Sequence, residues 1–402
     1  DFVAALERPN SQRRFAVVED DDELERMLDA PLEKWRVFLH PSQRQLVTMN
    51  ANGPVRVLGG AGTGKTVVAM HRAVWLAENV FNEADDQLLF TTYTRNLASD
   101  IRENLRLIGS PDVLNRIEVK NLDAWVHGFL REQGYPYTVD YGDRAADLWE
   151  RALLVGPEDR GPDFLRNEWE QVIQPHGITS EREYMRVSRI GRGTPIRRKE
   201  RQEIWPVFQE YQSLLEDHQL RERPGALRDA RKILEEEGDI LPYRSILVDE
   251  AQDMGKQAFK LIRQMIPGGD QAHDIFIVGD AHQRIYDREV VLGHCGINIV
   301  GRGRKLRVNY RTTEENRKWA VRLLQGVEYD DLDGGTDDQE VYKSLMSGEE
   351  PRVETFDSFS GEAKAIAEYL RARTEAGEAL RNTCIIARTK SLLDNYDGVI
   401  RG

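Results

Sequence analysis

One short segment constrains the fold of this chain more than any other. Residues 59–66 read Gly-Gly-Ala-Gly-Thr-Gly-Lys-Thr, with the apolar run 55–58 before them and apolar residues at helical spacing after them. Glycines let backbone N–H groups close around phosphate oxygens, and the following helix adds the positive end of its dipole. The segment therefore predicts a phosphate-binding loop between a strand and a helix. The alternative, a glycine turn before an ordinary helix, is disfavoured by the flanking pattern.

The second motif lies in residues 246–253, which read Ile-Leu-Val-Asp-Glu-Ala-Gln-Asp. Its apolar run ends in two adjacent acids, Asp249 and Glu250. Lys65 of the glycine loop is expected to reach the β- and γ-phosphates, and the Thr66 hydroxyl to bind Mg²⁺. Asp249 then serves the metal, and Glu250 polarises the attacking water. Adjacent acids can also merely cap a helix, but the glycine loop makes that interpretation less attractive.

Composition and charge narrow the class of protein. The chain has 402 residues, 40% of them hydrophobic and 31% charged, which predicts two or three globular domains. We find no signal peptide and no apolar run of about eighteen residues, so we expect a cytoplasmic protein without a membrane partner. Two cysteines, Cys295 and Cys384, lie in or beside apolar runs and are expected to be buried reduced thiols.

The net charge of −13 argues against indiscriminate coating of nucleic acid but allows a local track. Residues 182–201 carry eight positive and two negative side chains, and a smaller basic cluster lies in residues 302–307. Phosphate contact and a solvated helix face are equally good interpretations of the larger cluster.

An alternation of strands and helices predicts an α/β fold with a parallel sheet. The expected strands are residues 55–58, 88–92, 246–248 and 275–278. The alternation stops in residues 131–235, which read as a helical insertion. A third region opens near residue 301, with a helical pattern at 362–370 and an expected strand at 384–387, and residues 1–30 look like an N-terminal extension.

Two further motifs follow apolar runs, each weak alone. In residues 277–286, Gln283 can hydrogen-bond both water and a γ-phosphate. In residues 306–313, Tyr310 offers an aromatic face for a purine, and Arg311 offers a guanidinium for a phosphate.

In this order the motifs resemble those of the UvrD/Rep-like branch of superfamily 1 helicases. The similar segments are residues 39–44 (Q motif), 59–66 (motif I), 89–96 (Ia), 249–253 (II), 279–286 (III) and 309–313 (IV). The resemblance covers about residue 36 to 402. It implies a RecA-like P-loop NTPase core, with a first RecA-like domain at 31–130 and 236–300, the helical insertion at 131–235 and a partial second RecA-like domain at 301–402.

The resemblance also implies roles for single residues, with ATP and Mg²⁺ as cofactors. The implied nucleotide-binding residues are Gln43, Gly60, Ala61, Gly62, Thr63, Gly64, Lys65, Thr66, Arg72, Tyr310 and Arg311. The implied catalytic residues are Lys65, Asp249, Glu250, Gln283 and Arg311, and the metal ligands are Thr66 and Asp249. Single-stranded or partly duplex DNA would contact Thr92, Tyr93, Arg95, Asn96 and Tyr286.

Several positions depart from the family pattern. Arg288 stands where an aromatic residue is usual, His282 where an acid is common, and Asn121-Leu122-Asp123 where Thr-Phe-His is usual. We find no segment that matches motifs V and VI, so these 402 residues are expected to be a fragment that binds ATP but hydrolyses it slowly and does not unwind DNA.

The resemblance implies an intact protein that couples ATP hydrolysis to movement on single-stranded DNA, with 3′→5′ polarity. A nucleotide-gated binding or remodelling module that acts on a nucleic-acid machine without unwinding is the main alternative. RNA or a protein machine is then the alternative partner. A metabolic P-loop kinase is a third, and the Gln-Asp after the acidic pair disfavours it.

Overall fold

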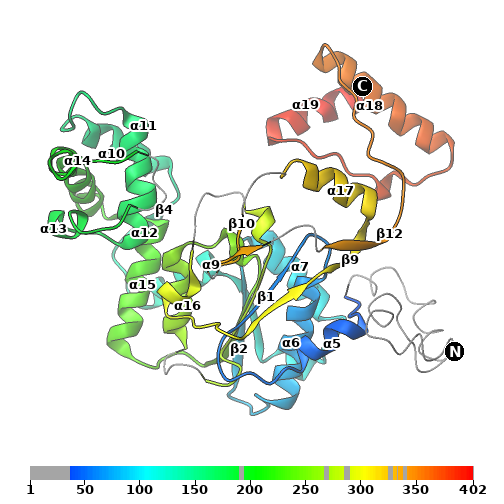
Figure 1. Cartoon of the computed structure of the whole chain (residues 1–402), viewed down its shortest axis with the longest axis horizontal. Helices are drawn as coiled ribbons and strands as arrows, with labels where there is room; N and C mark the ends of the chain where they lie inside the picture. Colours follow the sequence, from blue (N-terminus) through cyan, green and yellow to red (C-terminus); the bar gives the residue numbers. More distant parts are fainter. Residues whose placement is uncertain are drawn as a thin grey trace. The chain divides into compact units, whose positions relative to one another are not determined.

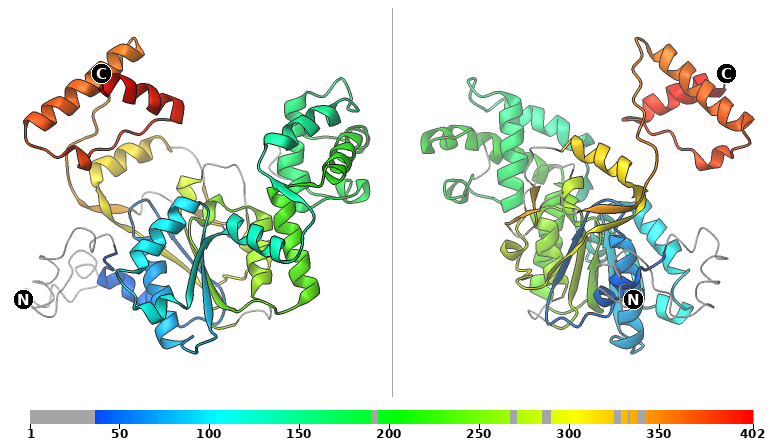
Figure 2. Two further views of the ribbon diagram at one scale, coloured as in Figure 1. Left: turned by 180° about the vertical axis from the view of Figure 1, so that it is seen from behind. Right: turned by 45° about the vertical axis from the view of Figure 1, so that its right-hand side comes forward.

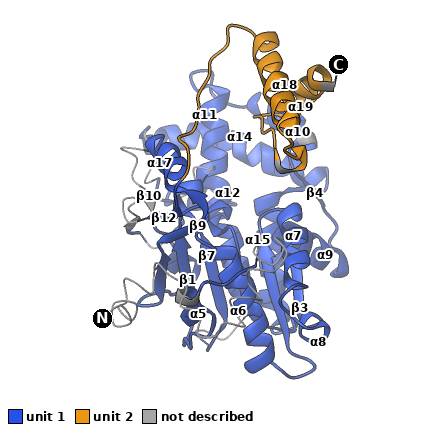
Figure 3. Ribbon diagram, turned by 90° about the vertical axis from the view of Figure 1, so that its right-hand side faces the viewer, with its two compact units in different colours: residues 1–347 blue, residues 348–402 orange. Residues whose placement is uncertain are grey.

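The computed structural model describes residues 37–189, 194–266, 271–284, 290–324, 329–332, 334–337 and 342–401. The chain divides into two compact units, Asp1–Ser347 and Gly348–Gly402 (Figure 3). The expected N-terminal extension at 1–30, the expected DNA-binding residue Tyr286, and Arg288 all lie outside the described residues.

A parallel sheet forms the centre of the first unit (Figure 1). Its six strands run in the order β3-β2-β6-β7-β1-β8, and every neighbouring pair is parallel. The strands are β1 (Val55–Gly59), β2 (Gln87–Thr92), β3 (Ile117–Asn121), β6 (Tyr243–Val248), β7 (Ile275–Gly279) and β8 (Gly303–Leu306). The α/β class, the parallel sheet and the four expected strands are confirmed. Strands β3 and β8 were not predicted, and β8 joins this sheet although the third region was expected to begin near residue 301.

Helices cover both faces of the sheet (Figure 2). Side chains alternate between the faces of a strand, and here they supply two separate cores. Leu88 and Phe90 belong to one core, together with α6 (Lys65–Asn79) and α7 (Arg95–Leu105). Leu89 belongs to the other, together with α9 (Leu122–Glu132), α15 (Arg223–Glu237) and α16 (Lys256–Met265). The short helices α5 (Pro41–Val47) and α8 (Pro111–Leu114) complete this part of the chain.

The expected insertion is largely helical and has its own core. Its helices are α10 (Asp143–Leu153), α11 (Pro162–Glu168), the π-helix η1 (Trp169–Ile173), α12 (Gln174–His176), α13 (Glu181–Tyr184) and α14 (Arg198–Asp217). A parallel strand pair, β4 (Thr138–Asp140) and β5 (Leu220–Glu222), lies within it. In its core the Tyr211 ring meets Trp149 and Trp169 edge-on, at centroid distances of 5.0 and 4.9 Å.

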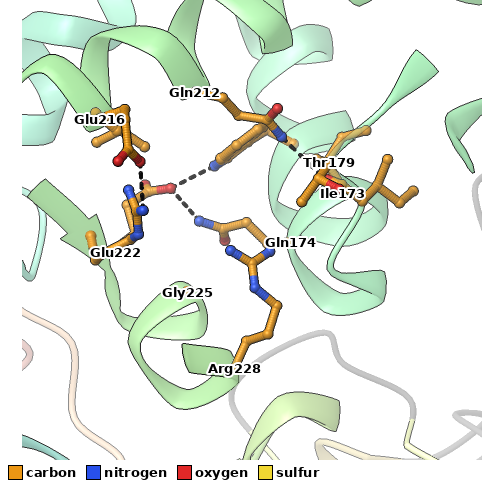
Figure 4. A pocket seen from close by; sticks show the side chains of 12 residues that line it. Ile173, Gln174, Thr179, Gln212, Glu216, Glu222, Gly225 and Arg228 are labelled. Atoms are coloured by element: carbon orange, nitrogen blue, oxygen red, sulfur yellow. Dashed lines mark hydrogen bonds and ion pairs between the residues drawn. The ribbon is translucent and has the colours of Figure 1, made fainter. Parts of the chain in front are cut away.

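A pocket of about 240 Å³ lies in the insertion (Figure 4). The Glu222 carboxylate in its wall accepts hydrogen bonds from Trp169 Nε1 at 2.7 Å and from Gln174 Nε2. Burial raises the pKa of Glu222, while Arg166 opposes that change. The Glu222 carboxylate therefore joins β5 to η1 and α12.

The basic segment 182–201 is partly structural. Arg189 pairs with the fully buried Glu168 at 2.6 Å, and Arg201 donates to the backbone carbonyls of Tyr184 and Val187. The remaining basic side chains that the structure describes are exposed: Arg182, Arg186, Arg197, Arg198 and Lys199. Arg189 and Arg201 thus have structural roles that neither interpretation foresaw, the exposed residues fit a solvated face, and phosphate contact stays a prediction.

The remaining elements described in the first unit are short: η2 (Ala251–Asp253), η3 (Ala281–Gln283), η4 (Leu292–Cys295), β9 (Val308–Thr313), α17 (Glu314–Arg322), β10 (Tyr329–Asp330), β11 (Thr336–Asp337) and β12 (Lys343–Met346). Strand β9 pairs with β12 in parallel, and β10 pairs with β11 antiparallel.

The second unit contains α18 (Phe359–Glu375), η6 (Leu380–Asn382) and α19 (Lys390–Arg401), and the Phe359 and Tyr396 rings pack at 4.9 Å. The helical pattern at 362–370 is confirmed within α18. The strand expected at 384–387 is wrong, because these residues form no strand. Cys295 is buried as expected, whereas Cys384 is exposed, and neither forms a disulfide. Among the described residues, no helix combines the length and apolar composition of a membrane span.

Candidate nucleotide-binding site

Three neighbouring strands deliver the sequence motifs to one edge of the sheet. The glycine loop follows β1, the acidic pair follows β6, and residues 280–283 follow β7, which lies between the other two strands. Because the carboxyl ends of parallel strands meet at one edge, motifs far apart in the sequence come together here.

The glycine loop is shaped by two left-handed residues. Gly62 has φ +73° and Gly64 has φ +81°, a region that glycine occupies without the steric cost of a Cβ atom. Gly64 is the N-cap of α6 and makes no side-chain capping bond, so the first N–H groups of the helix face the loop uncapped by a side chain. Thr63 Oγ1 donates to Gly60 O at 2.8 Å, which closes the turn around Ala61.

Lys65 is buried and directed back across the loop. Its ammonium donates to Gly60 O at 3.0 Å and lies 3.5 Å from Asp280 Oδ2. Asp280 is 1% exposed and also accepts a hydrogen bond from Gln283 Nε2 at 2.9 Å. Lys65 and Gln283, which were both expected at the γ-phosphate, therefore share one carboxylate. None of the expected roles fell on Asp280, although an acid at a strand end is a usable signal.

The expected metal ligands are in direct contact. Thr66 Oγ1 donates to Asp249 Oδ2 at 2.9 Å, and Asp249 is fully buried at the end of β6. Burial and the neighbouring Glu250 carboxylate raise the pKa of Asp249. A cation would offset the cost of this buried carboxylate, and hydroxyl and carboxylate oxygens are ligands that Mg²⁺ prefers. In the described part of the chain, no cluster of three or more His, Cys, Asp or Glu residues offers a protein-only metal cage.

Glu250 occupies a strained backbone position. Its φ of +53° and ψ of +44° fall in the left-handed region. Non-glycine residues seldom adopt this conformation, and those that do are often found at functional sites. Its carboxylate accepts a hydrogen bond from Gln252 Nε2, and Gln252 Oε1 accepts one from the backbone N–H of Asp280 at 2.9 Å. Gln252 is 2% exposed. It links the two motifs, a role that the sequence analysis did not identify.

Helix α5 brings Gln43 to the loop. Gln43 Nε2 donates to Thr63 O at 2.8 Å, and its Oε1 accepts from the backbone N–H of His40 at 3.2 Å. The His40 ring stacks on Tyr310, with centroids 4.7 Å apart and planes inclined by 28°. Gln43 and Tyr310, the two residues expected at the adenine, thus meet on one side of the loop through His40.

Arg72 anchors α5. Its guanidinium donates to the carbonyls of Leu46, Val47 and Met49 at 3.2, 2.8 and 3.0 Å, at the end of that helix. Burial lowers the pKa of Arg72 to about 10, which leaves it charged at neutral pH. Any effect of Arg72 on a nucleotide is therefore expected to act through the helix that carries Gln43.

The segment after β8 closes over the loop. The backbone N–H of Tyr310 donates to Gly62 O at 3.0 Å. Asn309 is 1% exposed, and its Oδ1 accepts from the N–H groups of Arg311 and Thr312 at 2.8 and 3.1 Å. The Arg311 side chain is exposed. Tyr310 and Arg311 therefore lie beside the glycine loop.

Tyr342 is a further residue at the loop that no motif indicated. A Cβ atom at Gly60 would lie 3.2 Å from the Tyr342 ring, which is itself 5% exposed and meets His282 edge-on at 5.8 Å. Residues 59–66 give no sign of this contact, because it comes from a segment nearly three hundred residues away.

The expected DNA-binding residues that the structure describes lie around the end of β2. Arg95 and Asn96 are exposed at the start of α7, and Tyr93 is half-buried. Thr92 is fully buried, so the structure does not bring its side chain to the surface. Asp123, at the position that departs from the family pattern, pairs with Arg223 at 2.7 Å.

Comparisons with known proteins found a matching family model and several similar proteins. The family model described as UvrD/REP helicase N-terminal domain matches residues 39–288. The chain is 24% identical over 410 residues to ATP-dependent DNA helicase UvrD1 of Mycobacterium bovis, which covers 92% of this chain and 49% of that protein. It is 21% identical over 396 residues to the mitochondrial ATP-dependent DNA helicase HMI1 of Saccharomyces cerevisiae, with 90% and 52% covered. DNA helicase II of Salmonella typhimurium is 23% identical over 384 residues, with 88% and 48% covered. The chain thus spans about half the length of these relatives.

Proposed function

The chain belongs to the UvrD/Rep helicase family, and from that premise we propose that it is the ATP-binding part of a DNA translocase or helicase. In this proposal ATP hydrolysis drives movement along single-stranded DNA, with 3′→5′ polarity and a cytoplasmic location. One observation carries most of the weight. Lys65, Thr66, Asp249 and Gln283 meet at adjacent strand ends, with Tyr310 bonded to the same loop.

ATP would bind by exchange of contacts that already exist. The Lys65 ammonium leaves Gly60 O and Asp280 for phosphate oxygens, which are stronger partners for a cation than a carbonyl. Gln43 turns from Thr63 O to the adenine edge. The adenine base stacks on the Tyr310 ring, which stacks on the His40 ring in this structure.

Thr66 and Asp249 would hold Mg²⁺, which supplies charge stabilisation to the transferring phosphoryl group. Glu250 orients the attacking water and takes its proton, and Gln252 holds the Glu250 carboxylate in place. Gln283 and Arg311 are proposed to sense the γ-phosphate, since Gln283 shares Asp280 with Lys65 and Arg311 projects from the segment over the loop. Strand β9 would then take one position with ATP bound and another with the hydrolysis products bound.

A test separates binding from hydrolysis. Lys65→Ala should abolish ATP binding, measured by titration calorimetry, because the phosphates lose their main cation. Glu250→Gln should bind ATP normally but hydrolyse it about 10²–10⁴-fold more slowly, since it removes only the general base. Glu78→Gln, an exposed glutamate on α6, is the matched control and should change neither quantity. Full ATP affinity in Lys65→Ala would reject the assigned site.

A nucleotide-gated remodelling module remains the second candidate, because the net charge of −13 weakens association with nucleic acid. ATP turnover by the intact protein, with and without oligo-dT, separates the two. An ATP turnover rate that rises with DNA supports the translocase proposal. A rate that is the same with and without DNA, in a protein that still binds ATP, supports the remodelling module.

A further inference from the structure

We propose that Tyr141 and Arg223 of the helical insertion continue the single-stranded DNA path that begins at Tyr93, as an added stacking platform for the bases. The inference rests on the proposed function, since it extends the DNA-binding surface of that same protein. It assigns DNA contacts to two residues that no sequence motif indicated.

The strand pair of the insertion sets Tyr141 beside Arg223. In the parallel pairing of β4 with β5, Asp140 lies opposite Glu222, so the next residue of each strand leaves the pair at the same level. The Asp140 carboxylate then accepts the N–H groups of Gly142 and Ala145 at 3.1 and 2.9 Å. These bonds fix the turn that carries Tyr141, so its position does not depend on a loose loop.

Arg223 connects the insertion to Tyr93. Its guanidinium lies over the Tyr93 ring at 5.1 Å from the centroid, and its Nε donates to Asp123 Oδ1 at 2.7 Å. Asp123 therefore holds the guanidinium at the aromatic face. A cation over a ring face is a favourable contact, and arginine planes also accept stacked bases.

Exposure and charge suit an anionic, aromatic ligand. The Tyr141 side chain is 61% exposed, and Arg95 is exposed at the start of α7. Burial raises the pKa of the Tyr141 hydroxyl, Asp123 raises it further, and Arg223 and Arg95 lower it, so these three charged groups act electrostatically on the hydroxyl. Two of the three charged groups that act on the Tyr141 hydroxyl are arginines, which can contact phosphates.

Aromatic rings interleaved with arginines are the chemistry of sequence-independent single-strand binding, because every base has a π-face and every nucleotide a phosphate. An exposed tyrosine at a turn is ordinary when it stands alone. Here Tyr141 follows the same strand pair as Arg223, and Arg223 lies over Tyr93, which a solvated turn would not require.

The test is fluorescence anisotropy of labelled oligo-dT with the protein at fixed salt. Tyr141→Ala should weaken binding on the order of tenfold, which corresponds to the loss of one base stack. Tyr141→Phe keeps the ring and should bind like the parent. Tyr369→Ala, which removes a tyrosine 51% exposed on α18, is the matched control and should also bind like the parent. ATP affinity should be equal in all of these variants.

Arg223 is tested through salt. Arg223→Gln should lower the slope of log affinity against log salt by about one, because one phosphate contact is lost. Unchanged oligo-dT affinity and salt slope in the Tyr141 and Arg223 variants, with weaker binding in Tyr93→Ala, would overturn this inference and leave the proposed function standing. A parent protein that binds ATP but no oligo-dT would overturn both.

Discussion

Gly62 offers the sharpest test of how the glycine loop meets the segment that closes over it. Its φ is +73°, and a Cβ atom there would lie 2.3 Å from Asn309 Oδ1 and 2.9 Å from Arg311 Cβ. Alanine would therefore meet two costs: about 1–2 kcal/mol for the left-handed backbone, and about 1–3 kcal/mol for overpacking. Asn309 cannot retreat freely, because its Oδ1 already accepts two backbone N–H groups.

We expect Gly62→Ala to lower the free energy of unfolding by about 2–5 kcal/mol, or to displace residues 309–311 from the loop at a similar cost. Displacement would also move Tyr310 and weaken ATP binding at least about tenfold, since each 1.4 kcal/mol is a factor of ten. Urea denaturation measures the stability, and titration calorimetry with MgATP measures the affinity.

Gly134→Ala is the matched control, because Gly134 has a similar φ of +66° but no heavy atom within 4 Å of the added Cβ. It should cost only about 1–2 kcal/mol and leave ATP affinity unchanged. If the two variants lost the same stability and Gly62→Ala bound ATP like the parent, the contact between residues 309–311 and the loop would not exist in solution.

Three other predictions concern buried and paired charges. Arg72→Met should lower the free energy of unfolding in urea by about 2–4 kcal/mol, because three carbonyls at the end of α5 lose their donor; a loss below about 1 kcal/mol would contradict the anchoring role. Glu168→Gln should lower the free energy of unfolding by about 3–5 kcal/mol, because it leaves the buried Arg189 charge uncompensated. Hydrogen exchange should show reduced amide protection in the insertion, and protection equal to the parent's there would contradict the prediction. Hydrogen bonds from Arg317 hold the pKa of Glu314 at about 2, below its usual 4.5, so its stabilising effect should persist above pH 4.5 and disappear as the pH falls toward 2. Thermal melts of Glu314→Gln across that window should lack this acid-dependent loss, and melts identical to the parent's would disprove it.

The sequence predicts the centre of the sheet better than its edges. The four expected strands are buried on both faces, so they read as continuous apolar runs. Edge strand β3 instead alternates, with Ile117 and Val119 buried and Glu118 and Lys120 partly exposed. Edge strand β8 carries two basic residues among four. Neither forms an apolar run, and both were missed for that reason.

An apolar run does not suffice when no partner strand is near. Residues 384–387 are apolar, yet Ile386 is 88% exposed and the described residues of the second unit contain no strand to pair with them. Strand formation depends on backbone hydrogen bonds to a neighbour, which local sequence does not reveal.

In the site, motifs at strand ends were enough to predict that Lys65, Thr66 and Asp249 come together, because sheet topology forces their approach. Contacts made by the surrounding chain were not predictable. The packing of Tyr342 on Gly60 and the left-handed Glu250 both depend on tertiary structure, and neither residue type signals it. The catalytic and binding roles themselves stay predictions until the variants above are measured.

Strands β8 and β9 are separated by a single residue, Arg307. One residue spans at most about 3.6 Å, so the join has almost no slack. At one end of it β8 is hydrogen-bonded along β1, and at the other Tyr310 is bonded to Gly62. A displacement of β9 is therefore transmitted directly to β8, the outermost strand of the sheet, because no flexible linker separates the two strands.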